Sequence, residues 1–237
     1  MSVHDSNDWS EALFSRIIES IQSENPITIV RYGDGELTCV MYAKKGGGGF
    51  NYDGDLYDAN LGAMIKDTIL NPIAESNFVY ALGEHCRHVG FVSTLERDKL
   101  WNPNIKWEDA FVFVHAGIDG RLQSLIDLIN EQHSIFVAPE YLHGIKVDFD
   151  TYVTTTEHRS FTAKDEIERK VEEQLSQDSP SIVICALGMS AIPIIHSLYR
   201  KFGNSHTFID IGSVFDPYVS DGKYRSHFDK IQKKLDL

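Results

Sequence analysis

Two carboxylates stand two positions apart in the segment Arg31-Tyr32-Gly33-Asp34-Gly35-Glu36, directly after the apolar run of residues 27–30. Open α/β sheets bind their ligands at the carboxyl ends of strands, so a site is expected at this point of the chain. Asp34 and Glu36 supply the hard oxygen ligands that Mg²⁺ or Mn²⁺ prefers, and Arg31 adds a fixed cation that favours an anionic substrate. Aspartate between glycines is also ordinary turn chemistry, so the segment alone is equally consistent with a simple turn.

A second candidate site is the corner Leu187-Gly188-Met189-Ser190-Ala191, where a predicted buried strand ends at a glycine and a predicted helix begins. The free N–H groups at the start of such a helix, together with the Ser190 hydroxyl, predict an anion-binding pocket. The corner has neither the lysine of a Walker loop nor a G-x-G-x-x-G pattern. A plain turn with Ser190 as the helix N-cap therefore explains the same residues.

Three further carboxylates follow later predicted strands. Glu140 comes directly after a strand, Asp210 lies in the last strand, and Asp216 lies in the loop that follows it. Strand ends can direct all three toward the cleft that would hold Asp34, where a carboxylate can act as a general base. The start of a helix accounts equally well for Glu140, and a turn accounts for Asp216.

A short basic group that contains Lys223 and Arg225 follows in a chain that is otherwise acidic. Two neighbouring cations suit a diphosphate. The solvated face of a C-terminal helix is the alternative explanation.

The other candidate motifs point less clearly to chemistry. The chain has ten histidines but no H-E-x-x-H, and we interpret His85 and His88 as structural or surface residues. It also lacks the G-x-S-x-G elbow of α/β-hydrolases. The glycines of residues 46–49 form either a loop that closes over a bound donor or a connector without one fixed conformation.

Composition narrows the class of partner and the compartment. The formal net charge is −13, which argues against nucleic acid and anionic membranes as partners because both require clustered Lys and Arg. The three cysteines show no paired spacing, and no run of about 18 apolar residues or basic leader is present. We therefore expect a soluble cytoplasmic protein with reduced cysteines and without an integral membrane segment.

Strands and helices are expected to alternate along the whole chain. The predicted helices cover residues 8–22, 57–70, 94–101, 122–130, 162–177 and 190–202, and the predicted strands cover residues 27–31, 77–82, 111–115, 135–138, 146–156, 182–187 and 207–211. The residues Thr162 to Asp165 resemble a capping box at the start of one helix. This alternation predicts a single α/β domain over residues 1–237, doubly wound and Rossmann-like, with a mostly parallel sheet and helices on both faces.

The chain resembles the glycosyltransferases of the GT-D fold. The likeness is carried by residues 31–36, similar to the Asp-x-Glu metal motif of that family, and by residues 186–191 with 209–212, similar to its closing βαβ segment; together they cover about a quarter of the chain. The resemblance implies that Asp34 and Glu36 hold Mn²⁺ or Mg²⁺ against the diphosphate of a UDP-sugar. The chain departs from the family where Met189-Ser190 replaces a frequent Pro-Thr, and where residues 213–216 replace a histidine-containing continuation.

These observations predict a metal-dependent glycosyltransferase that moves a sugar from a nucleotide-sugar donor to a glycan or another hydroxyl acceptor. Gly33, Gly188, Met189, Ser190 and the basic side chains would contact the donor, and one of Glu140, Asp210 and Asp216 would activate the acceptor. A metal-dependent phosphohydrolase and a non-catalytic module that binds a nucleotide-sugar or sugar phosphate are the alternatives. The sequence is compatible with a homodimer.

Overall fold

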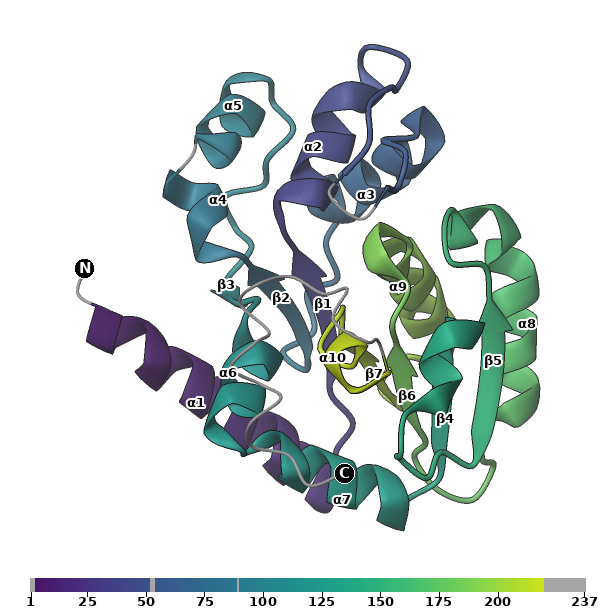
Figure 1. Ribbon diagram of the computed structural model, residues 1–237. Coiled ribbons are helices and arrows are strands. Elements are labelled where there is room, and N and C mark those ends of the chain that lie inside the picture. The colour runs from purple at the N-terminus through teal and green to yellow at the C-terminus, as the bar shows by residue number, and fades with distance from the viewer. Residues whose placement is uncertain (1–2, 52–53, 89, 220–237) are drawn as a thin grey trace.

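Seven strands form one wholly parallel sheet in the order β3-β2-β1-β7-β6-β4-β5 in the computed structural model, which describes residues 3–51, 54–88 and 90–219 (Figure 1). The strands are β1 (Thr28–Tyr32), β2 (Phe78–Leu82), β3 (Trp107–Asp109), β4 (Ser134–Pro139), β5 (Thr151–Thr155), β6 (Ile182–Cys185) and β7 (Thr207–Asp210). The predicted α/β class with a parallel sheet is confirmed.

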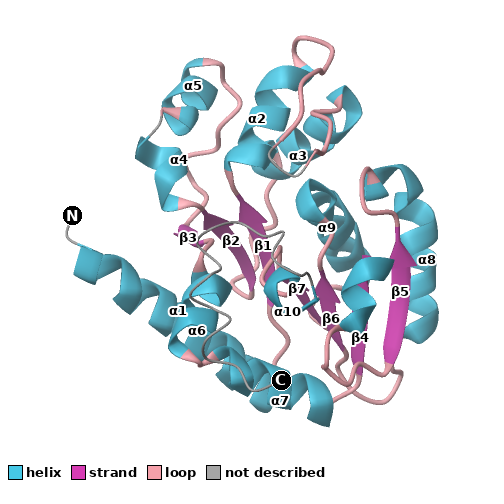
Figure 2. Ribbon diagram, viewed as in Figure 1, coloured by secondary structure: helices cyan, strands magenta, loops and turns pink. Residues whose placement is uncertain are grey.

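Helices cover both faces of the sheet (Figure 2). The α-helices are α1 (Val3–Gln22), α2 (Asp34–Ala43), α3 (Ala59–Leu70), α4 (Glu84–His88), α5 (Phe91–Arg97), α6 (Val112–Asp119), α7 (Leu122–Glu131), α8 (Lys164–Gln174), α9 (Ala191–Phe202) and α10 (Asp216–Val219), and the short 3₁₀ helices are η1 (Glu140–Gly144), η2 (Ser160–Ala163) and η3 (Gly188–Ser190). One apolar core lies under α2, α3, α8 and α9, and the other lies under α1, α6 and α7.

Alternate residues of each central strand enter the two cores. In β1, Val30 and Tyr32 pack under α2, α3 and α9, whereas Ile29 faces the core under α1 and α6. Successive side chains of a strand point to opposite faces, and a strand covered on both faces is therefore apolar at nearly every position. The continuous apolar run at residues 182–187 predicted a strand for this reason. The structure places β6 at four of those six residues.

The helix α2 begins at Asp34, directly after the first strand, where the sequence indicated only a turn. Gly33 is the N-cap, and its N–H donates to Glu36 Oε2 over 2.7 Å, which is one half of a capping box. Both acidic residues thus occupy the first turn, where the helix dipole favours negative charge. The two carboxylates are displayed by a helix N-terminus rather than by a free turn.

One predicted strand and one predicted helix cap are wrong. Residues 111–115 were expected to form a strand but belong mostly to α6. The prediction failed because most of that helix is buried, so its apolar run shows no 3.6-residue period. The expected capping box at Thr162 is also absent: α8 begins at Lys164, and the Thr162 hydroxyl donates to the Arg159 carbonyl over 2.9 Å instead.

The four glycines of residues 46–49 begin the loop that connects α2 to α3, and the two arms of this loop run antiparallel. The Gly48 N–H donates to the Tyr57 carbonyl over 3.0 Å, the Tyr57 N–H donates to the Gly49 carbonyl over 3.0 Å, and Phe50 bridges to Leu56. All four glycines have positive φ, a conformation that other residues rarely adopt. The run therefore encodes one specific turn rather than a connector without structure.

None of the helices within the described ranges combines the length and the hydropathy that a bilayer-spanning segment requires.

Candidate functional site

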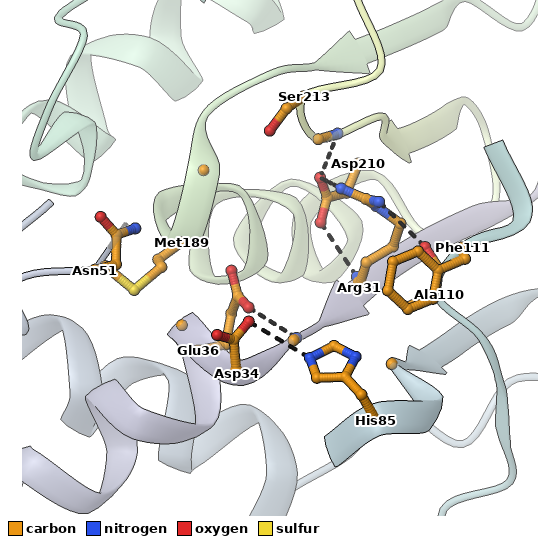
Figure 3. A pocket seen from close by; sticks show the side chains of 15 residues that line it. Arg31, Asp34, Glu36, Asn51, His85, Ala110, Phe111, Met189, Asp210 and Ser213 are labelled. Carbon is orange, nitrogen blue, oxygen red and sulfur yellow. Dashed lines mark hydrogen bonds and ion pairs between the residues drawn. The ribbon is translucent and has the colours of Figure 1, made fainter. Parts of the chain in front are cut away.

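A cleft of about 430 Å³ opens at the carboxyl ends of five neighbouring strands, β3, β2, β1, β7 and β6 (Figure 3). Its walls are the last residues of these strands, the segments that follow them and the loop between α2 and α3. The lining residues are Arg31, Gly33, Asp34, Gly35, Glu36, Asn51, Gly83, His85, Ala110, Phe111, Gly188, Met189, Asp210, Gly212 and Ser213. Parallel sheets bring the carboxyl ends of their strands to one edge, which is why segments so distant in the chain meet here.

The predicted pair of carboxylates lies side by side on one wall of this cleft (Figure 3). The side chain of Asp34 is 64% exposed, and Glu36 lies deeper beside the Gly33 amide. Burial raises the pKa of the Glu36 carboxyl to about 7, although two backbone N–H groups oppose the rise by hydrogen bonding. Glu36 therefore takes up a proton near neutral pH, and a bound cation would compete with that proton.

His85 approaches the same carboxylates from the neighbouring strand end. Its Nε2 lies 3.6 Å from Asp34 Oδ1, and its ring packs beside Phe111 with the centroids 5.6 Å apart. A Cβ on Gly83 would lie 2.8 Å from the His85 ring, so the glycine leaves the space that the imidazole occupies. The sequence analysis interpreted His85 as a structural or surface residue and did not predict its position beside Asp34 in the cleft.

Arg31 and Asp210 form an ion pair at the floor of the cleft, with Nη2 3.5 Å from Oδ1. Asp210 is 3% exposed and also accepts the N–H groups of Arg31, over 3.2 Å, and of Gly212, over 3.0 Å. Burial raises the pKa of the Asp210 carboxyl, and the charge and hydrogen bonds of Arg31 act against that rise. The guanidinium is also held at Nη1, which donates to the Ala110 carbonyl over 3.1 Å.

The glycine corner contributes backbone and one side chain to the opposite wall. Gly188 has a φ of +53°, and Met189 packs toward Gly35, where an added Cβ would lie 3.6 Å from its sulfur. Ser190 is turned away: it is 3% exposed, and its Oγ accepts the Phe161 N–H over 3.2 Å. Its role is to hold the segment before α8 against the corner.

Two of the amides expected to bind an anion at this corner are already used. The Ser190 N–H donates to the Leu187 carbonyl over 3.1 Å, and the Ala191 N–H donates to the Gly188 carbonyl. The 3₁₀ turn η3 therefore satisfies donors that a plain helix start would leave open. Gly188 and Met189 are the residues of the corner that remain at the cleft wall.

The other predicted site residues do not line the cleft. Glu140 is exposed at the start of η1, and Asp216 begins α10, where the Tyr141 hydroxyl donates to it over 3.3 Å. Lys223 and Arg225 lie outside the described residues. Of the three carboxylates considered as bases, Asp210 alone is among the residues that form the cleft wall.

The donors around Asp34 suit a hard divalent cation in kind but not in number. Within the described ranges, no three His, Cys, Asp or Glu side chains are already arranged as a ligand set. Mg²⁺ commonly binds proteins through one or two carboxylates and takes its other ligands from water and substrate phosphates. Asp34 and Glu36 fit that partial type of site, in which the substrate completes the coordination.

His85, Asn51, Phe111 and Ser213 are among the cleft residues that sequence reasoning did not assign to the site. A usable signal existed for His85, because Gly83-Glu84-His85 follows a buried strand in the same way that Gly33-Asp34 follows β1. Comparison of the chain with protein-family models, with curated proteins and with solved structures found no match. The geometry of the cleft and the resemblance of residues 31–36 are therefore the features that bear on function.

Proposed function

We propose that this chain is a metal-dependent glycosyltransferase that moves a sugar from a nucleotide-sugar donor, most plausibly a UDP-sugar, to a glycan or another hydroxyl acceptor. The observation that carries the proposal is that Asp34 and Glu36 face the same cleft as the Arg31 guanidinium. Carboxylates alone would suit a cation, and a guanidinium alone would suit an anion. Their combination suits a diphosphate that arrives together with a divalent cation.

In this proposal Asp34 and Glu36 would hold Mn²⁺ or Mg²⁺. The bound cation would offset the negative charge that grows on the diphosphate as it leaves the sugar. Arg31 would donate to phosphate oxygens, and the absence of side chains at Gly33 and Gly188 would allow those oxygens to approach the backbone. Membership of the GT-D fold family is proposed on residues 31–36, since a parallel α/β sheet is shared by many unrelated activities.

One contact favours a second candidate, a non-catalytic module that binds a nucleotide-sugar or a sugar phosphate. Glu36 Oε2 already accepts the Gly33 N–H over 2.7 Å, which is the structural role of an N3 glutamate in a helix cap. If capping is its whole role, nucleotide binding needs no cation. A phosphohydrolase lacks comparable support, because two-metal hydrolases bring more ligands together than the described residues provide.

Thermal unfolding with UDP separates these candidates. UDP at a hundred times its Kd stabilises by about 2.7 kcal/mol, which raises the Tm of a chain of this size by roughly 5–10 °C. We expect this rise with Mn²⁺ or Mg²⁺ and not with EDTA, and we expect the double variant Asp34→Asn, Glu36→Gln to abolish it. A matched control that removes two exposed acids of α1, Glu11→Gln with Glu19→Gln, should keep it.

Equal stabilisation by UDP in EDTA would refute the cation-dependent mechanism and favour the binding module. Turnover then identifies the reaction. Release of UDP from one member of a panel of UDP-sugars, accelerated by an added acceptor glycan, supports a transferase. Release of inorganic phosphate would support the hydrolase.

A further inference from the structure

Asp210 accepts three hydrogen bonds, and all of them come from Arg31 and Gly212. Oδ2 takes the Arg31 N–H over 3.2 Å, while Oδ1 takes the Gly212 N–H over 3.0 Å and Arg31 Nη2 over 3.5 Å. A carboxylate offers about four acceptor positions, so little capacity remains for a proton from an acceptor hydroxyl. The residue is also 3% exposed, which restricts the approach of any acceptor.

Gly212 is shaped to accommodate the same guanidinium. A Cβ at this position would lie 1.5 Å from Arg31 Nη2 and 2.6 Å from Cζ, a full collision with the planar group. The φ of Gly212 is +59°, which also directs its N–H to Asp210. The guanidinium thus lies against a backbone that has no side chain, between the Asp210 carboxylate and the Ala110 carbonyl.

Arg31 still has unused donor capacity at the cleft. A guanidinium carries five N–H donors, of which Nη1 and Nη2 each use one on the Ala110 carbonyl and on Asp210, while the buried Nε has no partner among the residues that the structure describes. Its side chain is 17% exposed, and the residue forms part of the cleft wall. An anionic oxygen bound at the edge of the guanidinium would supply charge-assisted hydrogen bonds of the kind that arginine makes with phosphate.

We infer that Asp210, together with Gly212, is a positioning residue that fixes the Arg31 guanidinium against the diphosphate of the donor, and that it is not the catalytic base. The inference rests on the proposed function for the identity of the anion. The sequence analysis considered Asp210 only as a candidate base. A base acts only when an acceptor loses its proton, whereas a positioning residue already acts when the donor binds.

Binding of UDP alone, with saturating Mg²⁺ and without acceptor, therefore tests the assignment. Isothermal titration should show at least tenfold weaker binding for Gly212→Ala, which displaces the guanidinium while both charges are kept, and for Arg31→Lys. Asp210→Asn should weaken UDP binding to a similar degree. Gly203→Ala is the matched control, because Gly203 has the same φ of +59° and a Cβ there would meet nothing within 4 Å.

UDP affinity within twofold of the Gly203→Ala control in both Gly212→Ala and Asp210→Asn would overturn the positioning role. Loss of acceptor-dependent turnover in Asp210→Asn alone, with UDP binding intact, would instead make Asp210 the base. If Asp210→Asn fails to fold, Gly212→Ala decides the question. Absence of UDP binding to the natural chain, with or without Mg²⁺, would overturn the proposed function and this inference together.

Discussion

His196 is an imidazole buried in the core without a polar partner. It lies in α9 at 2% exposure, with its ring centroid 4.8 Å from that of Phe78 and 5.6 Å from that of Tyr80. Neither of its nitrogens has a hydrogen-bond partner among the described residues. Burial lowers the pKa of this imidazole to about 3, and the charge of Arg200 adds to the effect.

The low pKa makes folding stability depend on pH through this one group. An unfolded histidine has a pKa of about 6.5, so the unfolded chain takes up a proton here below pH 6.5 and the folded chain does not. Stability is therefore fully present above pH 6.5 and falls as the pH drops toward 3. At about 1.4 kcal/mol for each pH unit, the loss that His196 causes between pH 8 and pH 5 is about 2 kcal/mol.

Urea unfolding of the natural chain and of His196→Phe at pH 8 and pH 5 measures this loss. Other titrating groups contribute equally to both proteins, so the difference between them isolates the imidazole. We expect the variant to gain about 2 kcal/mol relative to the natural chain on going from pH 8 to pH 5. His196→Leu provides a second apolar replacement in case the larger ring does not pack.

The same comparison between pH 8 and pH 9, where the imidazole is neutral in both states, serves as the internal control and should show no change. A stability difference that is the same at pH 5 and pH 8 would refute the reasoning. It would mean that His196 becomes protonated in the folded protein, through a partner or a path to solvent that the packing around Phe78 and Tyr80 does not provide.

Two further substitutions test the packing that supports the cleft. Gly62→Ala should destabilise the chain by at least about 2 kcal/mol, measured by urea unfolding. The added Cβ would lie 2.3 Å from the Cys39 carbonyl oxygen and 2.8 Å from Ala43 Cβ, where α3 crosses α2. A loss of stability below about 0.5 kcal/mol would contradict this close approach. Ser190→Ala should cost about 1–3 kcal/mol by leaving the buried Phe161 N–H without its acceptor, while the Kd for UDP stays within twofold. A tenfold increase in the Kd for UDP would instead indicate that Ser190 contacts the ligand, as the sequence analysis predicted.

The fold was predictable from sequence where burial left a clear pattern. The strand at residues 182–187 is apolar at every position, and the α9 helix ends at Phe202 with Gly203 as its C-cap, so both elements were found to within a few residues. The helix α6 was mistaken for a strand because its exposed positions are too few to reveal a period. The residues at the two ends of α6 are typical of helix ends and could have indicated a helix. The Asp109 side chain accepts the Phe111 N–H over 2.9 Å at the start, and Gly120 caps the other end with a φ of +80°.

Gly188, Met189 and Asp210 were also predicted as site residues and line the cleft, but contacts within the site were predictable only where its residues are close in the sequence. Asp34 and Glu36 stand on one wall of the cleft because two positions of a single helix turn carry them, and no knowledge of the sheet is needed to group them. The meeting of Arg31 with Asp210, or of Asp34 with His85, depends on the order of strands in the sheet. Strand order follows from long-range packing, which local patterns do not encode.

The placement of β7 has a consequence for how the protein is made. This strand pairs with β1 on one side and with β6 on the other, and without it the sheet consists of two separate groups, β3-β2-β1 and β6-β4-β5. During synthesis, the edges of β1 and β6 that pair with β7 have no partner until residues 207–210 leave the ribosome. Arg31 can therefore meet Asp210, 179 positions later, only once β7 has been made, and a chain that stops before residue 207 would lack both the strand that joins the two groups and the complete cleft.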